Sequence, residues 1–319
     1  MQLKPGIGDL LWMLAGAALL GAVMLLVLRF HEREDSAAEL ALKAKRIDLE
    51  AEMRLDLAAE SEAEKSAVMA VTDEDSQRFA DEARRASAAV AAQRDELAQS
   101  VTVHGEKVLL QQFSNEFAEL RRIDDEILML AVKNTNLKAA RLAFGPAADS
   151  IAQMEAALAH VAERHAAAAE GSKVAVLALD ARAAALRIET LIPPHIAEEN
   201  DAKMDAIEKR MAEFASQVKR DLDDLAAIGA LRADPDLAVA AKRFAEFGDL
   251  EKQILSLSRE NTNVRSLAIS LDKKRRAMFA CQESLDALQQ AMWKEPVAGV
   301  DYARPSNPRG LGAEAQREH

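Results

Sequence analysis

The sequence contains little glycine, proline or aromatic side chain. Of its 319 residues, 12 are Gly, 8 are Pro, 9 are Phe, 2 are Trp and 1 is Tyr, whereas 50% are hydrophobic. The scarcity of aromatic residues favours helices over strands. The scarcity of Gly and Pro leaves long helices uninterrupted. The composition therefore predicts an all-α fold.

Cysteine is almost absent as well. Cys281 is the only one in the sequence, which excludes an intramolecular disulfide, a cluster of thiolate metal ligands and a c-type haem attachment motif. It lies near Met278, Phe279 and Leu285 in a helical pattern, so we expect a buried structural thiol.

Residue patterns typical of enzymes are also missing. The sequence has no Gly-rich phosphate loop, nucleophile elbow or metalloprotease motif. His160 and His165 are spaced so that a helix turns them to different sides, and adjacent acids such as Asp124 and Asp125 diverge in the same way. We therefore predict no catalytic residue, no metal site and no cofactor.

The formal net charge is −12, and basic and acidic residues alternate along the chain. This pattern is typical of a solvated helical surface and argues against nucleic acid as a partner. Short basic clusters remain, and they have two interpretations: a solvated helix face or contact with an anionic membrane. The candidates for membrane contact are Lys43, Lys45, Arg46, Lys273, Lys274, Arg275 and Arg276.

One long apolar run, LLWMLAGAALLGAVMLLVL, occupies residues 10–28 after a short tail of residues 1–9. About 19 residues at about 1.5 Å each span the hydrocarbon core, which predicts a transmembrane helix. A cleavable signal peptide is less well supported, because no Ala-x-Ala-like site follows the run. Basic residues gather after it, which places the bulk of the chain in the cytoplasm. We expect a single-pass protein of the bacterial inner membrane, or of an intracellular membrane derived from it.

A duplication organises the rest of the chain. A shift of 127 residues carries the Asn-Thr-Asn tripeptide at 134–136 onto the one at 261–263, and it aligns Phe117 with Phe244. A unit of this length is a small domain rather than a solenoid repeat. The predicted parts are a first helical bundle over residues 29–165, a second over residues 166–294, and a disordered tail over residues 295–319.

Helical periodicity places six long helices. Apolar residues recur at spacings of three, four and seven, and polar residues at about 72 and 200 can cap the helices that follow them. The predicted helices run from the membrane to about residue 71 and over residues 73–99, 106–144, 147–191, 201–227 and 234–293. Since the helix over residues 147–191 would end one bundle and begin the next, we predict two stacked antiparallel bundles that form an elongated rod.

The two Asn-Thr-Asn segments interrupt an apolar stripe. Continued in phase, the stripe reaches Asn134 and Asn261, so their amides should face the bundle interior. A buried Asn needs hydrogen-bond partners and can fix the register of its neighbours. The alternative is a polar pocket that binds a small ligand between helices. Its candidate groups are Asn134, Asn136, Asn261, Asn263 and, for a carboxylate, Arg259 or Arg265.

A resemblance to known proteins rests on three stretches, VTDEDSQRFADEARR, HGEKVLLQQFSNEFAEL and ILSLSRENTNVRSLAISLDKKR. They look like parts of the helical bimodular sensor domain of methyl-accepting chemotaxis receptors, over roughly residues 40–293. The resemblance implies tandem four-helix bundles, dimerisation and a small ligand bound between helices. The output modules of those receptors have no counterpart in this sequence. In architecture alone, an anchor before a long helical domain is also similar to magnetosome membrane-tubulating proteins of the MamY type.

Two functions follow as hypotheses. The first is a non-enzymatic, membrane-anchored scaffold that binds, bends or tubulates the bilayer; its expected partners are lipid, further copies of the chain in a homodimer or larger oligomer, and a partner membrane protein. The second is a chemoreceptor-like sensor that binds a small ligand and signals through a separate partner. The side of the membrane on which the bundles lie distinguishes the two.

Overall fold

The computed structural model describes the backbone of residues 7–297 and the side chains of Met24 and residues 36–297. All regular structure in these residues is helical, which confirms the predicted fold class at that level. The α-helices are α1 (Ile7–Met69), α2 (Asp73–Ser100), α3 (His104–Ala131), α4 (Thr135–Leu142), α5 (Ala148–Arg164), α6 (Gly171–Ala197), α7 (Asp201–Ala227), α8 (Pro235–Glu260), α9 (Thr262–Ile269) and α10 (Arg275–Lys294). The short turns between them are the π-helical η1 (Ala143–Ala147) and η3 (Ser270–Lys274) and the 3-10 helix η2 (Gly229–Leu231).

The apolar run that was predicted to cross a membrane belongs to α1. Apart from Met24, the side chains of residues 10–28 lie outside the described residues. Among the residues that the structure does describe, no helix is both long enough and apolar enough to span a bilayer. Most of the predicted disordered tail, from residue 298 onward, also lies outside the description.

Contacts divide the chain into two compact units. Unit 1 comprises Met1–Leu55, Ala89–Asn115 and Gln282–His319, and unit 2 comprises Asp56–Ala88 and Glu116–Cys281. These units differ from the predicted domains 29–165 and 166–294, because each unit contains residues of both. The cause of this difference is that the last helix of each repeat packs against helices of the other repeat.

Unit 1 contains parts of α1, α2, α3 and α10. Arg54 of α1 pairs with Asp286 of α10, and Gln289 of α10 donates to Glu50 of α1. Its largest buried apolar side chains include Met53, Leu97, Phe113, Leu288 and Met292. These parts of the four helices therefore enclose an apolar core with charged pairs at its edge.

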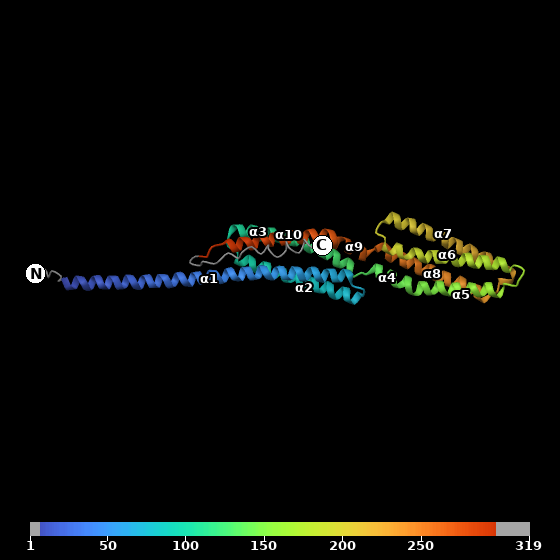
Figure 1. The fold of residues 1–319 in the computed structure, drawn as a ribbon, viewed down its shortest axis with the longest axis horizontal. Helices are drawn as coiled ribbons and strands as arrows, with labels where there is room; N and C mark the ends of the chain where they lie inside the picture. Colours follow the sequence, from blue (N-terminus) through green and yellow to red (C-terminus); the bar gives the residue numbers. More distant parts are fainter. Residues whose placement is uncertain (1–6, 298–319) are drawn as a thin grey trace, which may run out of the picture. The chain divides into compact units, whose positions relative to one another are not determined.

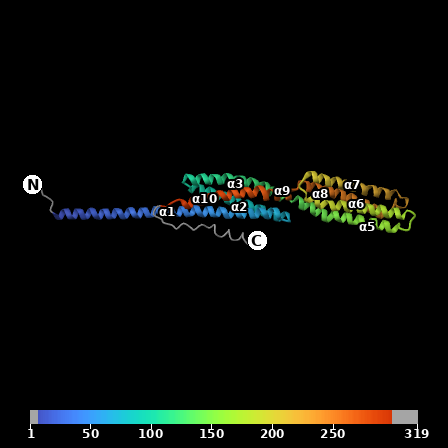
Figure 2. The same ribbon diagram turned by 45° about the horizontal axis from the view of Figure 1, so that its top comes forward.

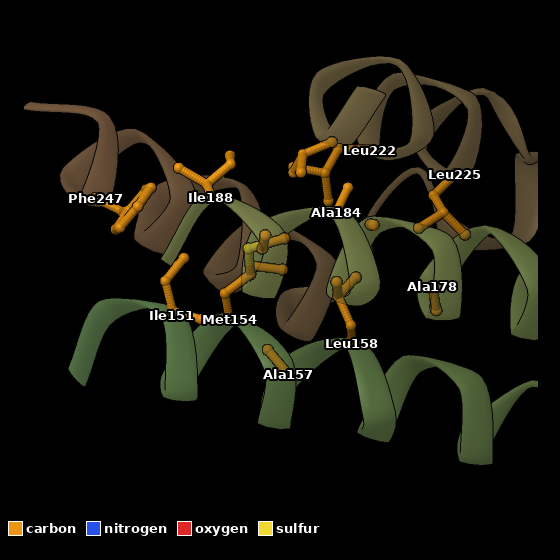
Figure 3. Packing of buried hydrophobic residues seen from close by; sticks show 14 of the residues in the cluster. Ile151, Met154, Ala157, Leu158, Ala178, Ala184, Ile188, Leu222, Leu225 and Phe247 are labelled. Atoms are coloured by element: carbon orange, nitrogen blue, oxygen red, sulfur yellow. The ribbon is translucent and has the colours of Figure 1, made fainter. Parts of the chain in front are cut away.

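Within unit 2, the helices α5, α6, α7 and α8 pack side by side (Figures 1 and 2). Their shared core includes Met154 of α5, Ile188 of α6, Leu225 of α7 and Phe247 of α8, all of which are fully buried. Figure 3 shows side chains of this cluster between the helices. Burying one such side chain stabilises the fold by about 1.5–3 kcal/mol. The apolar stripes of the sequence thus form a continuous core here.

Each repeat contributes its last helix to the other repeat. α5, the last helix of the first repeat, contacts α6 and α8 of the second. In the opposite direction, Ile269 and Ala277 of the second repeat pack against Val68, Ile123 and Ile127 of α1 and α3. The prediction of one separate bundle per repeat is therefore wrong, because within unit 2 the two repeats exchange these helices.

The predicted helix over residues 147–191 is also wrong, because the chain turns back within it. α5 ends at Arg164, α6 begins at Gly171, and the two helices contact each other. A Cβ on Gly171 would lie 2.4 Å from the backbone oxygen of Ala166 and 2.6 Å from that of His165, so only Gly fits. The Ala-rich sequence before and after this turn keeps the helical period, so the period of the apolar residues does not reveal the turn.

The predicted helix starts near residues 73 and 201 are confirmed. Thr72 Oγ1 accepts a hydrogen bond from the backbone N–H of Asp75 at 3.0 Å, and Asn200 Oδ1 accepts one from Lys203 at 3.1 Å. Such caps satisfy N–H groups that have no partner inside the helix. Local sequence is therefore sufficient to position both helix starts.

Gly171→Ala should destabilise the protein, because the added Cβ meets two backbone oxygens. Overpacking of this kind costs about 1–3 kcal/mol, to be measured as the free energy of unfolding in denaturant followed by circular dichroism. Gly248→Ala is the matched control: Gly248 lies inside α8, where a Cβ meets no atom within 4 Å. Since Ala favours a helix interior, this control should gain about 0.5–1 kcal/mol. Equal effects of the two substitutions would contradict the assigned turn.

Candidate functional site

Two asparagines break the long helices. Asn134 lies between α3 and α4 with φ of 51°, and Asn261 lies between α8 and α9 with φ of 52°. Left-handed backbone is unfavourable for most residues, but Asn tolerates it. The predicted helices over residues 106–144 and 234–293 are therefore each interrupted. Both asparagines are nevertheless buried, in agreement with the phase of the apolar stripe.

Residues 134–136 and 261–263, here termed the NTN crossover, bind each other reciprocally. The backbone N–H of Asn136 donates to Asn263 Oδ1 and that of Asn263 donates to Asn136 Oδ1, both at 3.1 Å. Thr135 and Thr262 make the same exchange, each backbone N–H donating to the other hydroxyl oxygen, at 3.2 and 3.1 Å. Each of these bonds joins residues 127 positions apart. The duplicated segments thus meet as near-symmetric partners.

Side-chain amides complete the network. Asn136 Nδ2 donates to Asn261 Oδ1 at 2.8 Å, and Asn263 Nδ2 donates to Asn134 Oδ1 at 2.9 Å. Further amide hydrogens bind acceptors outside the crossover, which are Asp73 Oδ1 at 3.0 Å and the carbonyls of Ile196 and Glu198, both at 2.7 Å. Each amide oxygen and nitrogen of the four asparagines therefore has a partner within the chain.

The crossover is better suited to holding helices than to holding a ligand. Its buried amides would each cost about 1–3 kcal/mol if left unpaired, so the network strongly favours one register of α4 against α9. Of the two arginines proposed for a carboxylate ligand, Arg259 already donates to Glu208 and Asp205, and Arg265 is exposed. The predicted site residues are thus brought together, with the exception of these arginines.

A buried histidine beside the crossover was missed by sequence reasoning. His195 has no exposed surface; its Nδ1 lies 2.8 Å from Ser258 Oγ and its Nε2 lies 2.8 Å from Glu208 Oε1. A hydrogen bond from Arg259 is the main cause of the lowered pKa of Glu208, followed by burial, which opposes it. Ser258 is also fully buried and donates to the His195 carbonyl at 3.0 Å. This polar cluster therefore ties α6 to α7 and α8 and gives a substrate no approach to Ser258.

A second buried cluster surrounds Lys274, which the sequence had suggested as a membrane contact. Its Nζ lies 2.8 Å from Glu60 Oε1, 3.0 Å from Glu64 Oε2 and 2.9 Å from Asp124 Oδ1. Every one of these side chains is less than a tenth exposed. Three carboxyl groups thus share one ammonium group inside the protein, and Lys274 is unable to reach a membrane from this position.

The excess of acid in this cluster changes its protonation. Burial is the largest cause that raises the pKa of Asp124, to about 8, and the neighbouring Glu60 adds to it. The same carboxylates raise the pKa of Lys274 although burial acts against its charge. At neutral pH Asp124 therefore keeps a proton while Lys274 stays charged, which reduces the negative charge that must be buried.

The other basic candidates fall into two groups. In unit 1, Lys43 and Arg46 are buried: Lys43 donates to the Trp293 and Glu295 carbonyls, and Arg46 pairs with Glu106 and Glu295. The remaining candidates are exposed and free to meet a charged surface, although two of them hold acidic partners. These exposed residues are Lys45, paired with Glu96, Lys273, Arg275, and Arg276, paired with Asp272.

No arrangement of three or more His, Cys, Asp or Glu side chains in the described part of the chain is suited to a metal ion. Cys281 is fully buried, and burial raises the pKa of its thiol to about 12. It is therefore a protonated core residue. His165, one of the two histidines considered above, lies 3.1 Å from Asp234, the residue that caps α8.

No protein-family model matches the chain, and no curated protein matches it. Function must therefore be inferred from the residues and contacts described above.

Asn261→Ala should lower the free energy of unfolding by about 2–4 kcal/mol, because it removes buried hydrogen bonds and strains a left-handed position. Asn261→Gly restores the backbone freedom but not the amide, so it should recover only part of the loss. Asn115→Ala, on the exposed face of α3, is the matched control and should change stability little. Denaturant titrations of the three variants measure these effects, and equal stability of Asn261→Ala and the control would contradict the role of the crossover.

Asp124 should make stability depend on pH. Between its unfolded pKa near 3.8 and its folded pKa of about 8, the folded chain holds a proton that the unfolded chain lacks. The free energy of unfolding should therefore fall as pH rises from about 4 to about 8, by up to about 1.4 kcal/mol per unit, with no further loss from this group above 8.

Asp124→Asn should flatten this profile, whereas Asp249→Asn, which changes an exposed carboxylate, should leave its slope unchanged. Denaturation curves at several pH values measure both. A wild-type slope that persists in Asp124→Asn would show that another group holds the proton.

Proposed function

We propose that this chain is a non-enzymatic, single-pass membrane protein whose helical bundles form a scaffold at the bacterial inner membrane or a membrane derived from it. The continuity of α1 carries the proposal. α1 runs as one helix from Ile7 to Met69, so the apolar segment and the bundle residues after it belong to the same element. A helix without a break transmits position and orientation between an anchor and the domain that follows it.

The internal hydrogen bonding of the NTN crossover supports a mechanical function. A scaffold needs elements whose relative register stays fixed under load. The four asparagines of the crossover bond one another, Asp73 of α2 and the carbonyls of Ile196 and Glu198 at the end of α6, through amide hydrogen bonds at 2.7–3.0 Å. Such a joint resists sliding because several buried polar groups would lose their partners together.

Membrane contact by the bundles is the second part of the proposal. Four of the seven basic candidates are exposed, and at net charge −12 they form local patches rather than a basic face. Near an anionic membrane each such charge contributes about 1 kcal/mol, so the anchor supplies most of the affinity. Lipid and further copies of the chain are the proposed partners, and bending or tubulation of the bilayer is the proposed outcome.

A reporter that fluoresces only in the cytoplasm, fused after His319, should be bright, and a reporter active only outside the cytoplasm should be silent. The excess of basic residues after the apolar run motivates this expectation. The reverse result would remove the main support for an intracellular scaffold and would favour a sensor that faces outward.

Reconstituted in vesicles that contain anionic lipid, the full chain should deform them into tubules visible by electron microscopy. The double variant Lys273→Glu with Arg275→Glu should reduce tubulation, since it reverses two exposed charges. Lys209→Glu with Arg210→Glu, an equal change on α7, is the control. If the vesicles stay smooth at all protein densities, the proposed membrane deformation is wrong and only the anchoring remains.

One observation favours the sensor as a second candidate function. A cavity of about 200 Å³ lies among α1, α2 and α3, away from the crossover, and ionisable side chains line it. A scaffold has no need for such a space, whereas a ligand-responsive bundle does.

A further inference from the structure

The cavity in unit 2 has buried acids on one side and exposed groups on the other. Its volume is about 200 Å³, enough for a small organic molecule. Glu60 and Asp124 line it and are almost completely buried, so they form its floor. Arg84, Arg121 and Asp125 line it and are exposed, so they form its rim, with Ser87 and apolar groups of Ala83 and Leu128 between.

The residues around this cavity can be compared with those at the equivalent positions of the second repeat. The position equivalent to Ser87 in the second repeat, 127 residues on, holds Phe214, and the position equivalent to Arg84 holds the buried Met211. Phe214 packs against the core of its repeat, and the Arg187 guanidinium lies 5.4 Å above its ring. The same place in the fold can therefore be filled by large side chains, and in the first repeat it is left hollow.

The charges of the two repeats differ in the same place. The residues that correspond to Glu60, Glu64, Asp124 and Lys274 are Arg187, Leu191, Glu251 and Ala147, and only Glu251 keeps an acid in place. A buried ionic cluster is thus dispensable for this architecture. Since buried ion pairs contribute little net stability compared with apolar packing, the cluster in the first repeat calls for another explanation.

The cluster holds more acidic than basic groups. Glu60, Glu64 and Asp124 face Lys274 alone, so three buried carboxyl groups share a single ammonium group. Glu60 is 1% exposed, and its Oε2, on a side chain that lines the cavity, bonds no N–H or hydroxyl donor, so inside the protein only Lys274 and the proton on the Asp124 carboxyl serve Glu60. A buried carboxylate that shares one ammonium group with two other acids is costly, and a second cationic donor in the cavity would reduce that cost.

We propose that this cavity binds a small primary ammonium compound, whose ammonium group donates to Glu60 and Asp124 at the floor. The ammonium compensates the excess of buried acid, and its three hydrogens can bond several carboxyl oxygens at once. A ligand that also carries a carboxylate can extend it toward Arg84 and Arg121 at the rim. The site does not depend on the scaffold function, since none of its residues belongs to the crossover or to the exposed basic patches.

Calorimetric titration and thermal shift of the full chain in detergent at pH 7 test the proposal with three probes of similar size. Ethanolamine carries the ammonium alone, β-alanine carries an ammonium and a carboxylate, and propionate carries the carboxylate alone. Ethanolamine and β-alanine should bind at millimolar or lower concentration and raise the melting temperature, whereas propionate should not. Binding of propionate alone, or of no probe at all, would overturn the assignment.

Two variants locate the site. Glu60→Gln should weaken binding of both amines at least tenfold, because it removes the charge but retains an acceptor for Lys274. Ser87→Phe copies the side chain of the second repeat and should abolish binding by filling the cavity. Arg187→Gln, at the position equivalent to Glu60, is the control and should bind as the wild type does.

If Ser87→Phe fails to fold, Glu60→Gln decides the question, with circular dichroism and the melting temperature of the free protein as checks of its fold. Undiminished amine binding in Glu60→Gln would place the ligand elsewhere and overturn the proposed site.

Discussion

Reciprocal hydrogen bonding between two copies of one tripeptide is the constraint on which the arrangement of unit 2 depends. The chain breaks its helix at Asn134 and again at Asn261, and each break satisfies the polar groups exposed by the other. Neither break would be tolerated alone, because buried amides without partners are costly. The exchange of α5 and α10 between repeats follows, since both helices continue from these breaks.

The two repeats share this joint but differ in what they bury on either side of it. In the first repeat Val68 and Ala131 are apolar, whereas the equivalent positions in the second repeat hold His195 and Ser258, which hydrogen-bond each other directly; His195 also contacts Glu208. Conversely, the positions equivalent to the Lys274 cluster hold Arg187, Leu191, Glu251 and Ala147, so the lysine shared by three acids occurs only once in the described residues. One backbone plan thus carries two different buried polar groups, which is why duplication of the fold does not imply duplication of function.

Periodicity recovered the helices whose ends are set by local capping. α2 and α7 begin after Thr72 and Asn200, whose side chains bond the first turn directly. The turn at Gly171 was missed because neighbouring Ala residues keep the helical period through it. The breaks at Asn134 and Asn261 were missed for a different reason. The apolar stripe correctly predicted that both residues face inward, but an Asn residue can adopt either helical or left-handed backbone, and the sequence does not distinguish the two.

The sequence by itself determined the helical class, the duplication, several caps and the inward position of the Asn-Thr-Asn segments, because these depend on neighbours within a few turns of helix. Only the tertiary structure decided which helices pack together and which charges are buried. Lys274 belongs to a basic run that looks exposed, yet it binds Glu60, 214 positions earlier in the chain. Burial of a charge depends on such distant partners, and local composition carries no record of them.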